Sequence, residues 1–312
     1  MRSESSGGLA KRRFGSYLPG FIPCAARVPG VYSALGMKRI LTAVVLIPLV
    51  LVVIFISPKW PIVLMSFVFI VAGLALWEYL GLADAMGAKT PRIVVLGCLA
   101  ILLAAIFRRP DLMAPVMGAI SLGLLILCTF RSPIERVLPD TACSVFGLIY
   151  IGFSMSTIYL LSAEDNGPSL LLFLLLVVWC GDIAALYIGR AFGRWSLARS
   201  LSPNKTWEGA IASVAASVLI GVVLVWAGGF LTARSIEYIS YPGSYLHWIG
   251  LAVLLNIAGQ AGDLVESAIK RGAGVKDSGR LLPGHGGFLD RIDALLLAAP
   301  VLWYAQLAQQ SF

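Results

Sequence analysis

Charged residues are scarce in this sequence. Asp, Glu, Lys and Arg make up 13% of its 312 residues, and hydrophobic residues make up 59%. A soluble domain has about 25% charged residues, so this composition excludes an ordinary soluble protein and indicates a chain that lies in a bilayer. The formal net charge of +8 is explained by basic cytoplasmic loops, and it also suits an anionic lipid or nucleotide as a partner.

Histidine and cysteine are also rare. Only two histidines are present, which excludes a zinc site with three histidine ligands. His247 begins an apolar run, where a packing role is the simpler interpretation. No spacing among the five cysteines matches a disulfide framework or a metal motif. They are Cys24, Cys98, Cys128, Cys143 and Cys180.

The first 36 residues lack the continuous apolar segment of a signal peptide. They are rich in Ser and Gly and basic, so we expect a disordered extension over residues 1–36. Met37 precedes the first apolar run almost directly and resembles a natural start, although a transit peptide is an alternative explanation. Residues 37–312 are then a single integral-membrane domain.

Long apolar runs dominate the rest of the chain. A bilayer core about 30 Å thick needs about 20 apolar residues per helix. We therefore predict an all-α polytopic membrane protein with about nine transmembrane helices and no soluble domain. The predicted helices are 40–57, 61–84, 92–107, 111–130, 141–162, 168–189, 209–232, 245–271 and 288–308.

Basic residues predict the orientation, because Lys and Arg are retained on the cytoplasmic side. With a cytoplasmic amino terminus, most of them fall in cytoplasmic segments, the carboxyl terminus is external, and the two most polar loops share the cytoplasmic face. The cytoplasmic set is Lys89, Arg92, Arg131, Arg136, Arg190, Arg194, Arg199, Lys205, Lys270, Arg271, Lys276 and Arg280, and the external set is Lys59, Arg108, Arg109 and Arg234.

The most polar stretch is residues 262–293. Asp263, Glu266 and Lys270 lie at positions i, i+3 and i+7, so a helix turns all three to one face. Carboxylates are ligands that Mg²⁺ prefers, and a lysine can neutralise phosphoryl oxygens. This face therefore has the chemistry to bind a metal ion and phosphate.

Gly284, Gly286 and Gly287 follow, and they let the backbone approach an anion closely. The helix that begins near Phe288 would direct free N–H groups to the same place, with Asp290 and Asp293 on its first turns. We expect the turn to bring Asp290 beside Asp263, with carboxylates roughly 4 to 6 Å apart around a shared ion.

A second polar stretch spans residues 189–209. Ser202 followed by Pro203 is typical of a helix start, with Ser202 as N-cap, and it would place Lys205 on the first turn, where an anion could bind. Asp182 lies near the cytoplasmic end of the preceding run, where the cost of burying a charge is smaller.

Glu78 lies inside the second apolar run. We interpret it as a structural residue near a helix end, paired with a neighbouring helix rather than with a substrate.

Four motifs stand in the two polar stretches: Ser202-Pro203-x-Lys205-Thr206-x-Glu208-Gly209, Ser267-x-x-Lys270-Arg271, Lys276-Asp277 and Leu282-Pro283-Gly284-His285-Gly286-Gly287-x-x-Asp290-Arg291-x-Asp293. Together they resemble the signature of the phosphatidate cytidylyltransferases, also called CDP-diacylglycerol synthases. The resemblance covers residues 37–308 in layout and 179–293 in motifs. Ile183, Leu186 and Arg199 depart from the family pattern, so the contacts that a hydroxyl or a tyrosine makes there are in question.

The resemblance implies an Mg²⁺-dependent enzyme of phospholipid biosynthesis in a bacterial inner membrane. It would transfer CMP from CTP to phosphatidate, an anionic lipid, and release pyrophosphate. A second ion, monovalent or divalent, and a homodimer both stay open, and no nucleic acid is expected.

The resemblance also implies roles for individual residues. Asp263 and Asp290 would hold the metal, with Asp293 and Glu266 as further ligands or just outside them, and His285 would donate a hydrogen bond to a phosphate oxygen. The expected catalytic residues are Asp263, Lys270, Arg271, Asp290 and His285. The expected substrate-binding residues are Lys205, Ser202, Ser267, Lys276, Asp182, Gly286, Gly287 and Arg291.

Two other functions are compatible with parts of this pattern. A CTP-dependent lipid kinase, such as a polyprenol kinase, would transfer the terminal phosphate instead and release CDP. A secondary transporter would bind near the membrane midplane between inverted repeats, whereas here the charges gather at one face and the two halves show no repeat.

Overall fold

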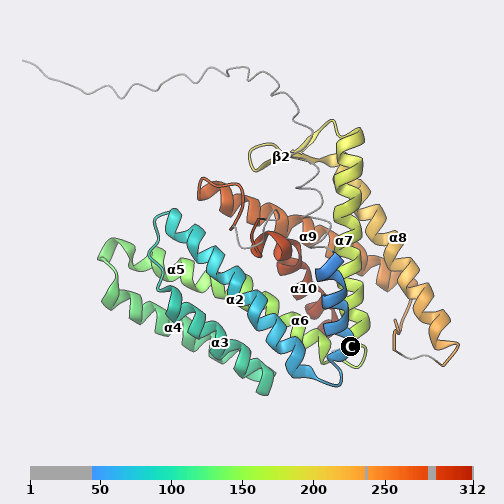
Figure 1. Cartoon of the computed structure of the whole chain (residues 1–312), viewed down its shortest axis with the longest axis horizontal. Coiled ribbons are helices and arrows are strands. Elements are labelled where there is room, and N and C mark those ends of the chain that lie inside the picture. Colours follow the sequence, from blue (N-terminus) through green and yellow to red (C-terminus); the bar gives the residue numbers. More distant parts are fainter. Residues whose placement is uncertain (1–43, 236–237, 280–285, 311–312) are drawn as a thin grey trace, which may run out of the picture.

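The computed structural model describes residues 44–235, 238–279 and 286–310. In this part of the chain, helices cover all of the predicted apolar runs (Figure 1), while the expected extension over residues 1–36 lies outside it. The long helices are Val44–Ile56, α2 (Pro61–Ala85), α3 (Arg92–Arg108), α4 (Met113–Arg131), α5 (Val137–Gly147), α6 (Ser154–Ser162), α7 (Gly167–Phe192), α8 (Trp207–Thr232), α9 (Tyr245–Gly272) and α10 (Leu289–Gln310).

Short helical segments extend some of these helices. The 3₁₀ turns Pro110–Leu112 and Ile134–Arg136 precede α4 and α5, and the π-helical segment Leu148–Phe153 joins α5 to α6. In the described ranges, 7 helices are long and apolar enough to cross a membrane. The chain is thus an all-α polytopic membrane protein, as predicted.

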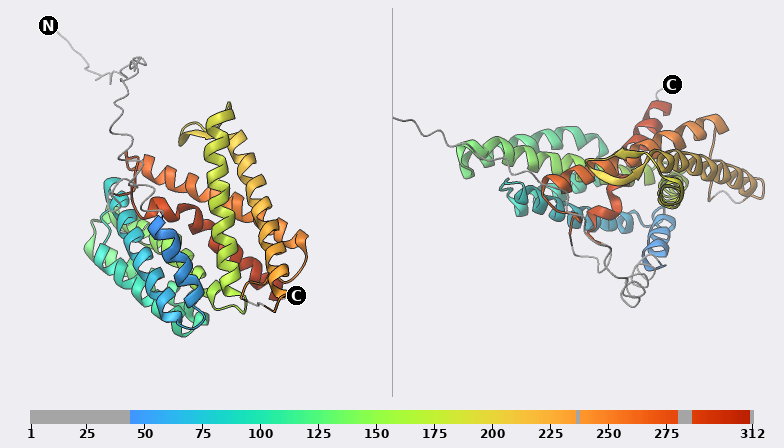
Figure 2. Two further views of the ribbon diagram at one scale, coloured as in Figure 1. Left: turned by 45° about the vertical axis from the view of Figure 1, so that its right-hand side comes forward. Right: turned by 90° about the horizontal axis from the view of Figure 1, so that it is seen from above.

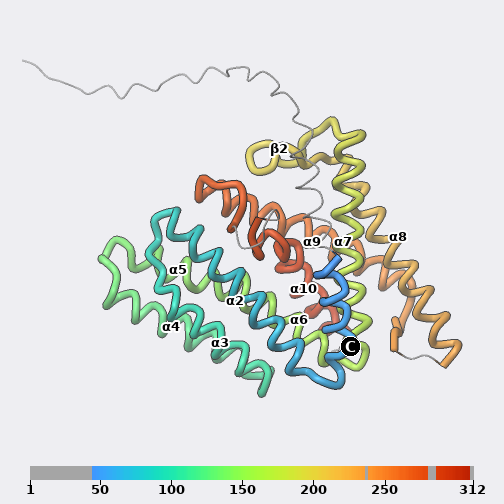
Figure 3. The backbone as a smooth tube through the Cα atoms, viewed as in Figure 1, coloured from blue at the N-terminus to red at the C-terminus, as the bar shows by residue number. Residues whose placement is uncertain are grey.

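The helices form two groups. Helices α2 to α6 lie together in one group, and α7 packs on α8, α8 on α9 and α9 on α10 in the other (Figures 1 and 2). Helix α10 also contacts α2, α6 and α7, so it lies between the groups, as the trace in Figure 3 shows. The side chains that are fully buried at the centre include Leu76, Leu80, Leu99, Leu102, Leu148, Leu161, Leu170 and Phe173.

A small antiparallel hairpin interrupts the helical pattern between α7 and α8. Its strands are β1 (Ser196–Ala198) and β2 (Ser202–Thr206), with Ser196 opposite Thr206. The prediction that Ser202 caps a helix is therefore wrong. The backbone from Ser202 onward is extended and pairs with β1. The cap is Thr206 instead, whose hydroxyl accepts a hydrogen bond from the Gly209 backbone N at 3.2 Å.

A buried polar cluster fixes α9 against α7 and α8. The side-chain amide of Asn256 donates to the hydroxyls of Ser213 and Ser217, both at 2.8 Å, and Ser217 in turn donates to the Val177 carbonyl at 2.7 Å. Gly181 makes room for this cluster, because a Cβ atom there would lie 2.7 Å from the Ser217 hydroxyl. These bonds set the rotation of α9 about two turns before Asp263.

Candidate active site

Three carboxylates from two helices come together where α9 meets α10. One oxygen each of Asp263, Glu266 and Asp293 lies within 4.8 Å of the other two. Asp263 and Glu266 share a face of α9 because they are three residues apart, and Asp293 faces them from the first turns of α10. We call these three residues the acid cluster.

Gly262 allows the two helices to approach closely at the acid cluster. A Cβ atom at this position would collide with the carbonyl oxygen of Asp293 and would lie 3.3 Å from the Cα atom of Ala294. Only a residue without a side chain fits there. The glycine next to Asp263 is thus what brings Asp293 to it.

Two lysines neutralise part of this charge. Lys205, at the end of β2, pairs with Asp263 at 2.6 Å, and Lys270 pairs with both Glu266 and Asp290 at 2.5 Å. The Glu266 side chain is fully buried and accepts no hydrogen bond from the described residues apart from this ion pair. Four carboxylates against two ammonium groups leave excess negative charge, which is costly in a buried site.

The donor set of the acid cluster fits a divalent cation. Mg²⁺ is bound through carboxylates, commonly one or two with substrate phosphates completing the shell. Here three carboxylates converge, and the buried Oε1 atom of Glu266 has no hydrogen-bond donor among the described residues, while Lys270 lies on Oε2. Binding a cation would reduce the repulsion between the carboxylates and give this Oε1 atom a partner.

Asp290 has a different environment from the one that the sequence suggested. Its carboxylate accepts hydrogen bonds from the backbone N of Gly287 at 2.8 Å and from the backbone N and hydroxyl of Ser278 at 3.0 and 2.9 Å, in addition to Lys270. It therefore holds the end of the loop between α9 and α10, and it is not a member of the acid cluster. The distance of roughly 4 to 6 Å that the sequence predicts between the carboxylates of Asp290 and Asp263 stays a prediction.

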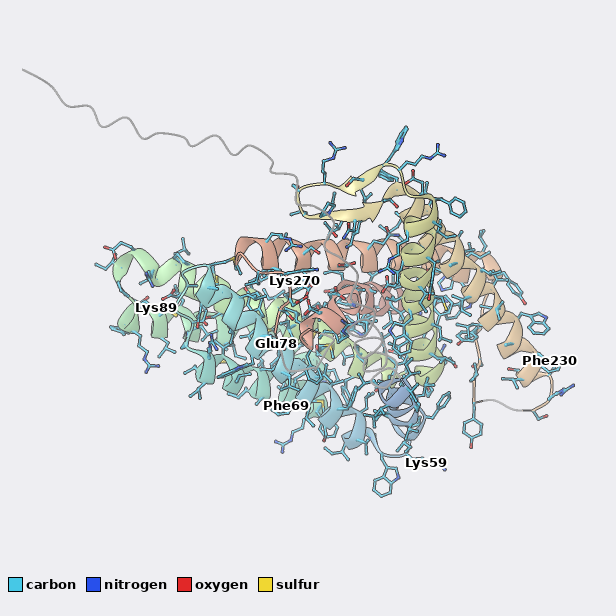
Figure 4. All side chains as sticks on the ribbon, turned by 45° about the horizontal axis from the view of Figure 1, so that its top comes forward. Lys59, Phe69, Glu78, Lys89, Phe230 and Lys270 are labelled. Carbon is cyan, nitrogen blue, oxygen red and sulfur yellow. The ribbon has the colours of Figure 1, made fainter. Side chains whose placement is uncertain are left out.

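Glu78 is the residue near this site that sequence reasoning did not assign to it. Its Oε2 atom accepts from the backbone N of Leu289 at 3.0 Å and from the hydroxyl of Ser278 at 3.2 Å. Figure 4 labels Glu78 on α2 and Lys270 on α9, both in the middle of the molecule. The prediction that Glu78 pairs with a neighbouring helix is thus confirmed, and that helix is α10. The signal in the sequence that could have assigned Glu78 to the site was a carboxylate inside an apolar run.

The other predicted site residues lie outside the acid cluster. The Arg271 guanidinium donates to the carbonyls of Leu201, at 3.4 Å, and Val275, at 3.1 Å, so it links the end of α9 to the hairpin. Ser202 lies on β2, Ser267 is half-buried on α9 and Lys276 is exposed. Gly286 (φ 77°) and the buried Gly287 adjoin Asp290, and His285 lies outside the described residues.

An apolar cavity of about 370 Å³ opens beside these polar groups. Its walls come from the helix Val44–Ile56, α2, α6, α7 and α10, with residues such as Val50, Leu64, Met155, Leu171 and Leu295. The polar side chains Asp182, Asp290, Arg291 and Asp293 complete the lining. Asp293 therefore belongs both to the acid cluster and to the wall of the cavity.

Known proteins resemble this chain along much of its length. The model of the cytidylyltransferase family matches residues 37–308. The phosphatidate cytidylyltransferase of Staphylococcus saprophyticus is 34% identical over 267 residues, covering 85% of this chain and 96% of the relative. The protein of the same name from Staphylococcus aureus (strain COL) is 31% identical over 274 residues, covering 85% and 95%.

A third relative is more similar over a shorter region. The phosphatidate cytidylyltransferase of Brucella suis biovar 1 is 49% identical over 158 residues, which is 50% of this chain. The match spans about half of the relative, 54% of its length.

Proposed function

Since the chain belongs to the cytidylyltransferase family, we propose that it transfers CMP from CTP to phosphatidate, giving CDP-diacylglycerol and pyrophosphate. The named relatives that match along most of their length are phosphatidate cytidylyltransferases. The observation that carries the proposal is the position of Asp293, which adjoins both a cluster of carboxylates and an apolar cavity. A charged nucleotide and a lipid can meet at such a place.

The cavity suits the lipid substrate. Its apolar walls offer the acyl chains an environment without water, which favours burial by about 25 cal/mol for each Å² of apolar surface. Arg291, on the first turn of α10, lines the same space and is the one basic residue among the described residues of its lining, so the phosphate group would lie next to Arg291. The charge of that guanidinium favours an anionic headgroup.

The acid cluster suits Mg²⁺ bound to the triphosphate. Asp263, Glu266 and Asp293 would hold the ion, and the ion would supply charge neutralisation for the phosphates when bound. Lys205 and Lys270 already lie on these carboxylates. Phosphoryl oxygens bound beside these carboxylates would meet both ammonium groups, which would stabilise negative charge as it develops.

The chemistry needs no strong general base. An oxygen of the phosphatidate phosphate is already an anionic nucleophile; it forms a bond to the α-phosphorus of CTP as the bond to the β-phosphate oxygen breaks and pyrophosphate leaves. Such transfers depend on positioning and charge neutralisation. This demand fits a site that is built from carboxylates and lysines among the described residues.

Incubation of the purified protein with CTP, phosphatidate and Mg²⁺ tests this function. The expected products are CDP-diacylglycerol, identified by mass spectrometry of the lipid, and pyrophosphate. Release of CDP with a phosphorylated lipid would identify a lipid kinase instead. No turnover of CTP without a gradient would favour a transporter.

The orientation in a bacterial inner membrane is a further part of the proposal, with the amino terminus and the active site cytoplasmic and about nine spans in total. Arg271 on α9 donates to Leu201 in the hairpin, which supports one shared membrane side for both polar loops. A homodimer and a second ion also stay predictions.

Reporter fusions test this topology. Fusions at Arg199 and Lys276 are expected to report a cytoplasmic location, and a fusion at Arg109 an external one, because basic residues gather on the cytoplasmic side. If both polar loops were labelled from outside, the orientation and the route by which CTP arrives would be wrong.

A further inference from the structure

Glu78 is a buried carboxylate that the transfer reaction does not use. It lies on α2, in the group of helices that contributes none of the acid cluster, and only 6% of it is exposed. Its partners lie 200 and 211 positions away along the chain: Ser278, in the loop after α9, and Leu289, at the start of α10. Burying a carboxylate costs free energy unless it accepts hydrogen bonds or forms an ion pair, so a buried glutamate is expected to have specific partners.

The contacts of Glu78 are with the backbone and a hydroxyl. Its Oε2 atom accepts from the backbone N of Leu289, the first residue of α10, at 3.0 Å. The first N–H groups of a helix have no partner within the helix, and a carboxylate there is also favoured by the helix dipole. Glu78 thus serves α10 as an N-terminal cap that comes from another helix.

The Ser278 hydroxyl connects this cap to Asp290. It lies 3.2 Å from Oε2 of Glu78 and 2.9 Å from Oδ2 of Asp290. A hydroxyl has one hydrogen to donate, so the two carboxylates share it. Any movement of Glu78 therefore also changes the hydrogen bonds of Asp290, which pairs with Lys270.

The loop backbone is shaped around the Glu78 carboxylate. A Cβ atom at Gly279 would collide with its Oε1 atom, and a Cβ atom at Gly287 would collide with its Oε2 atom and with the Ser278 hydroxyl. Two glycines on either side of the carboxylate let the chain approach it closely. This fit is specific to a side chain of the length of glutamate.

Glu78 acts here as a hydrogen-bond acceptor rather than as a member of an ion pair. Among the described residues it forms no salt bridge, and its Oε1 atom has no hydrogen-bond partner. The nearest ammonium group in the network, that of Lys270, pairs with Glu266 and Asp290 instead. An uncharged acceptor of the same shape should therefore preserve the contacts of Oε2.

We propose that Glu78 is a positioning residue for the active site: it fixes the first turn of α10 and so places Asp293 in the acid cluster and Asp290 on Lys270. The consequence for turnover rests on the function proposed above. The effect of Glu78 on the structure does not depend on that function, because it concerns only how the start of α10 is held. Through Glu78, the amino-terminal helices determine the geometry of a site to which they give no other charged group in the described ranges.

The test compares Glu78→Gln with Glu78→Ala. Glu78→Ala is expected to raise the Mg²⁺ concentration for half-maximal activity by about 10- to 100-fold, the usual cost of losing a residue that orients metal ligands. Glu78→Gln keeps an acceptor oxygen and is expected to change this Mg²⁺ concentration less than about threefold, because the amide oxygen can still accept from the Leu289 N–H and the Ser278 hydroxyl.

Hydrogen exchange gives a readout that does not depend on activity. In Glu78→Ala, amides of residues 278, 279 and 286–290 should exchange faster, since the Leu289 N–H loses its acceptor, while those of α8 should not. Asp84→Asn is the matched control: Asp84 is also on α2, but it binds Arg92 at 2.8 Å and Thr90 at 3.1 Å. It should affect neither measurement.

Three outcomes would overturn the positioning role. One is unchanged exchange at residues 278, 279 and 286–290 in Glu78→Ala. Another is a Glu78→Gln variant as impaired as Glu78→Ala, which would make the charge the essential property. The third is equal acceleration of exchange in α8, which would indicate general destabilisation. Failure of the wild-type protein to form CDP-diacylglycerol would contradict the proposed function and leave the exchange result as the test of Glu78.

Discussion

Asp293→Asn is expected to lower the rate of CDP-diacylglycerol formation by about 100- to 1000-fold, the usual cost of removing one group that stabilises charge in a transition state. The substitution removes a charge from the acid cluster without changing the volume of the side chain. Membrane insertion and the thermal unfolding temperature should therefore stay close to those of the wild type. Steady-state turnover over a range of Mg²⁺ concentrations measures the effect.

Asp290→Asn tests whether the acid cluster binds the metal, or whether Asp263 and Asp290 share it, as the sequence predicted. Turnover should also fall, because Lys270 loses one of its two carboxylates. The Mg²⁺ requirement should change much less than in Asp293→Asn, because the amide oxygen of asparagine can still accept from Gly287. If Asp290→Asn shifted the Mg²⁺ requirement and Asp293→Asn did not, the acid cluster would not be the metal site.

Gly262→Ala is expected to lower turnover by about 100-fold, since a displacement of about 1 Å among catalytic groups can have that effect. The added methyl group would collide with the Asp293 carbonyl and force α9 and α10 apart at the acid cluster. Because the obstacle is backbone, no side chain can rotate to make room. Turnover and thermal unfolding should both report the change.

Gly250→Ala provides the matched control on the same helix. A Cβ atom at Gly250 would meet no atom within 4 Å, so activity should be unchanged and helix stability should rise by up to about 1 kcal/mol. Equal losses in Gly250→Ala and Gly262→Ala would mean that α9 tolerates no added methyl group anywhere. Normal activity of Gly262→Ala would show that the close approach of the two helices is not required.

The helices were predictable because apolar runs long enough to span a bilayer leave few alternatives. The hairpin was not. Ser202 and Pro203 form a typical helix start when read locally, but Ala198 lies opposite Ser202 and pairing between the two segments extends the backbone there. Such pairing depends on residues on both sides of a turn, which a local capping pattern does not include.

The acid residues of the site were predictable individually, but their grouping was not. Asp263 and Glu266 share a helix face at a spacing that the sequence shows directly. Whether Asp290 or Asp293 joins them depends on how the loop before α10 folds, and Ser278 and Gly287 bind Asp290 instead. Glu78 reaches that loop from another helix. A carboxylate inside an apolar run indicates that a partner exists, but the sequence does not identify which residues it contacts.

The fit of Glu78 against two glycines has a consequence for the evolution of related sequences. A side chain at Gly279 or Gly287 would occupy the space of the Glu78 carboxylate. Substitutions at these three positions therefore depend on one another. A lineage that replaces Glu78 by a small residue loses the constraint on both glycines, and any lineage with a larger residue at Gly279 should have a shorter one at Glu78. An alignment of related sequences should therefore show these distant positions changing together.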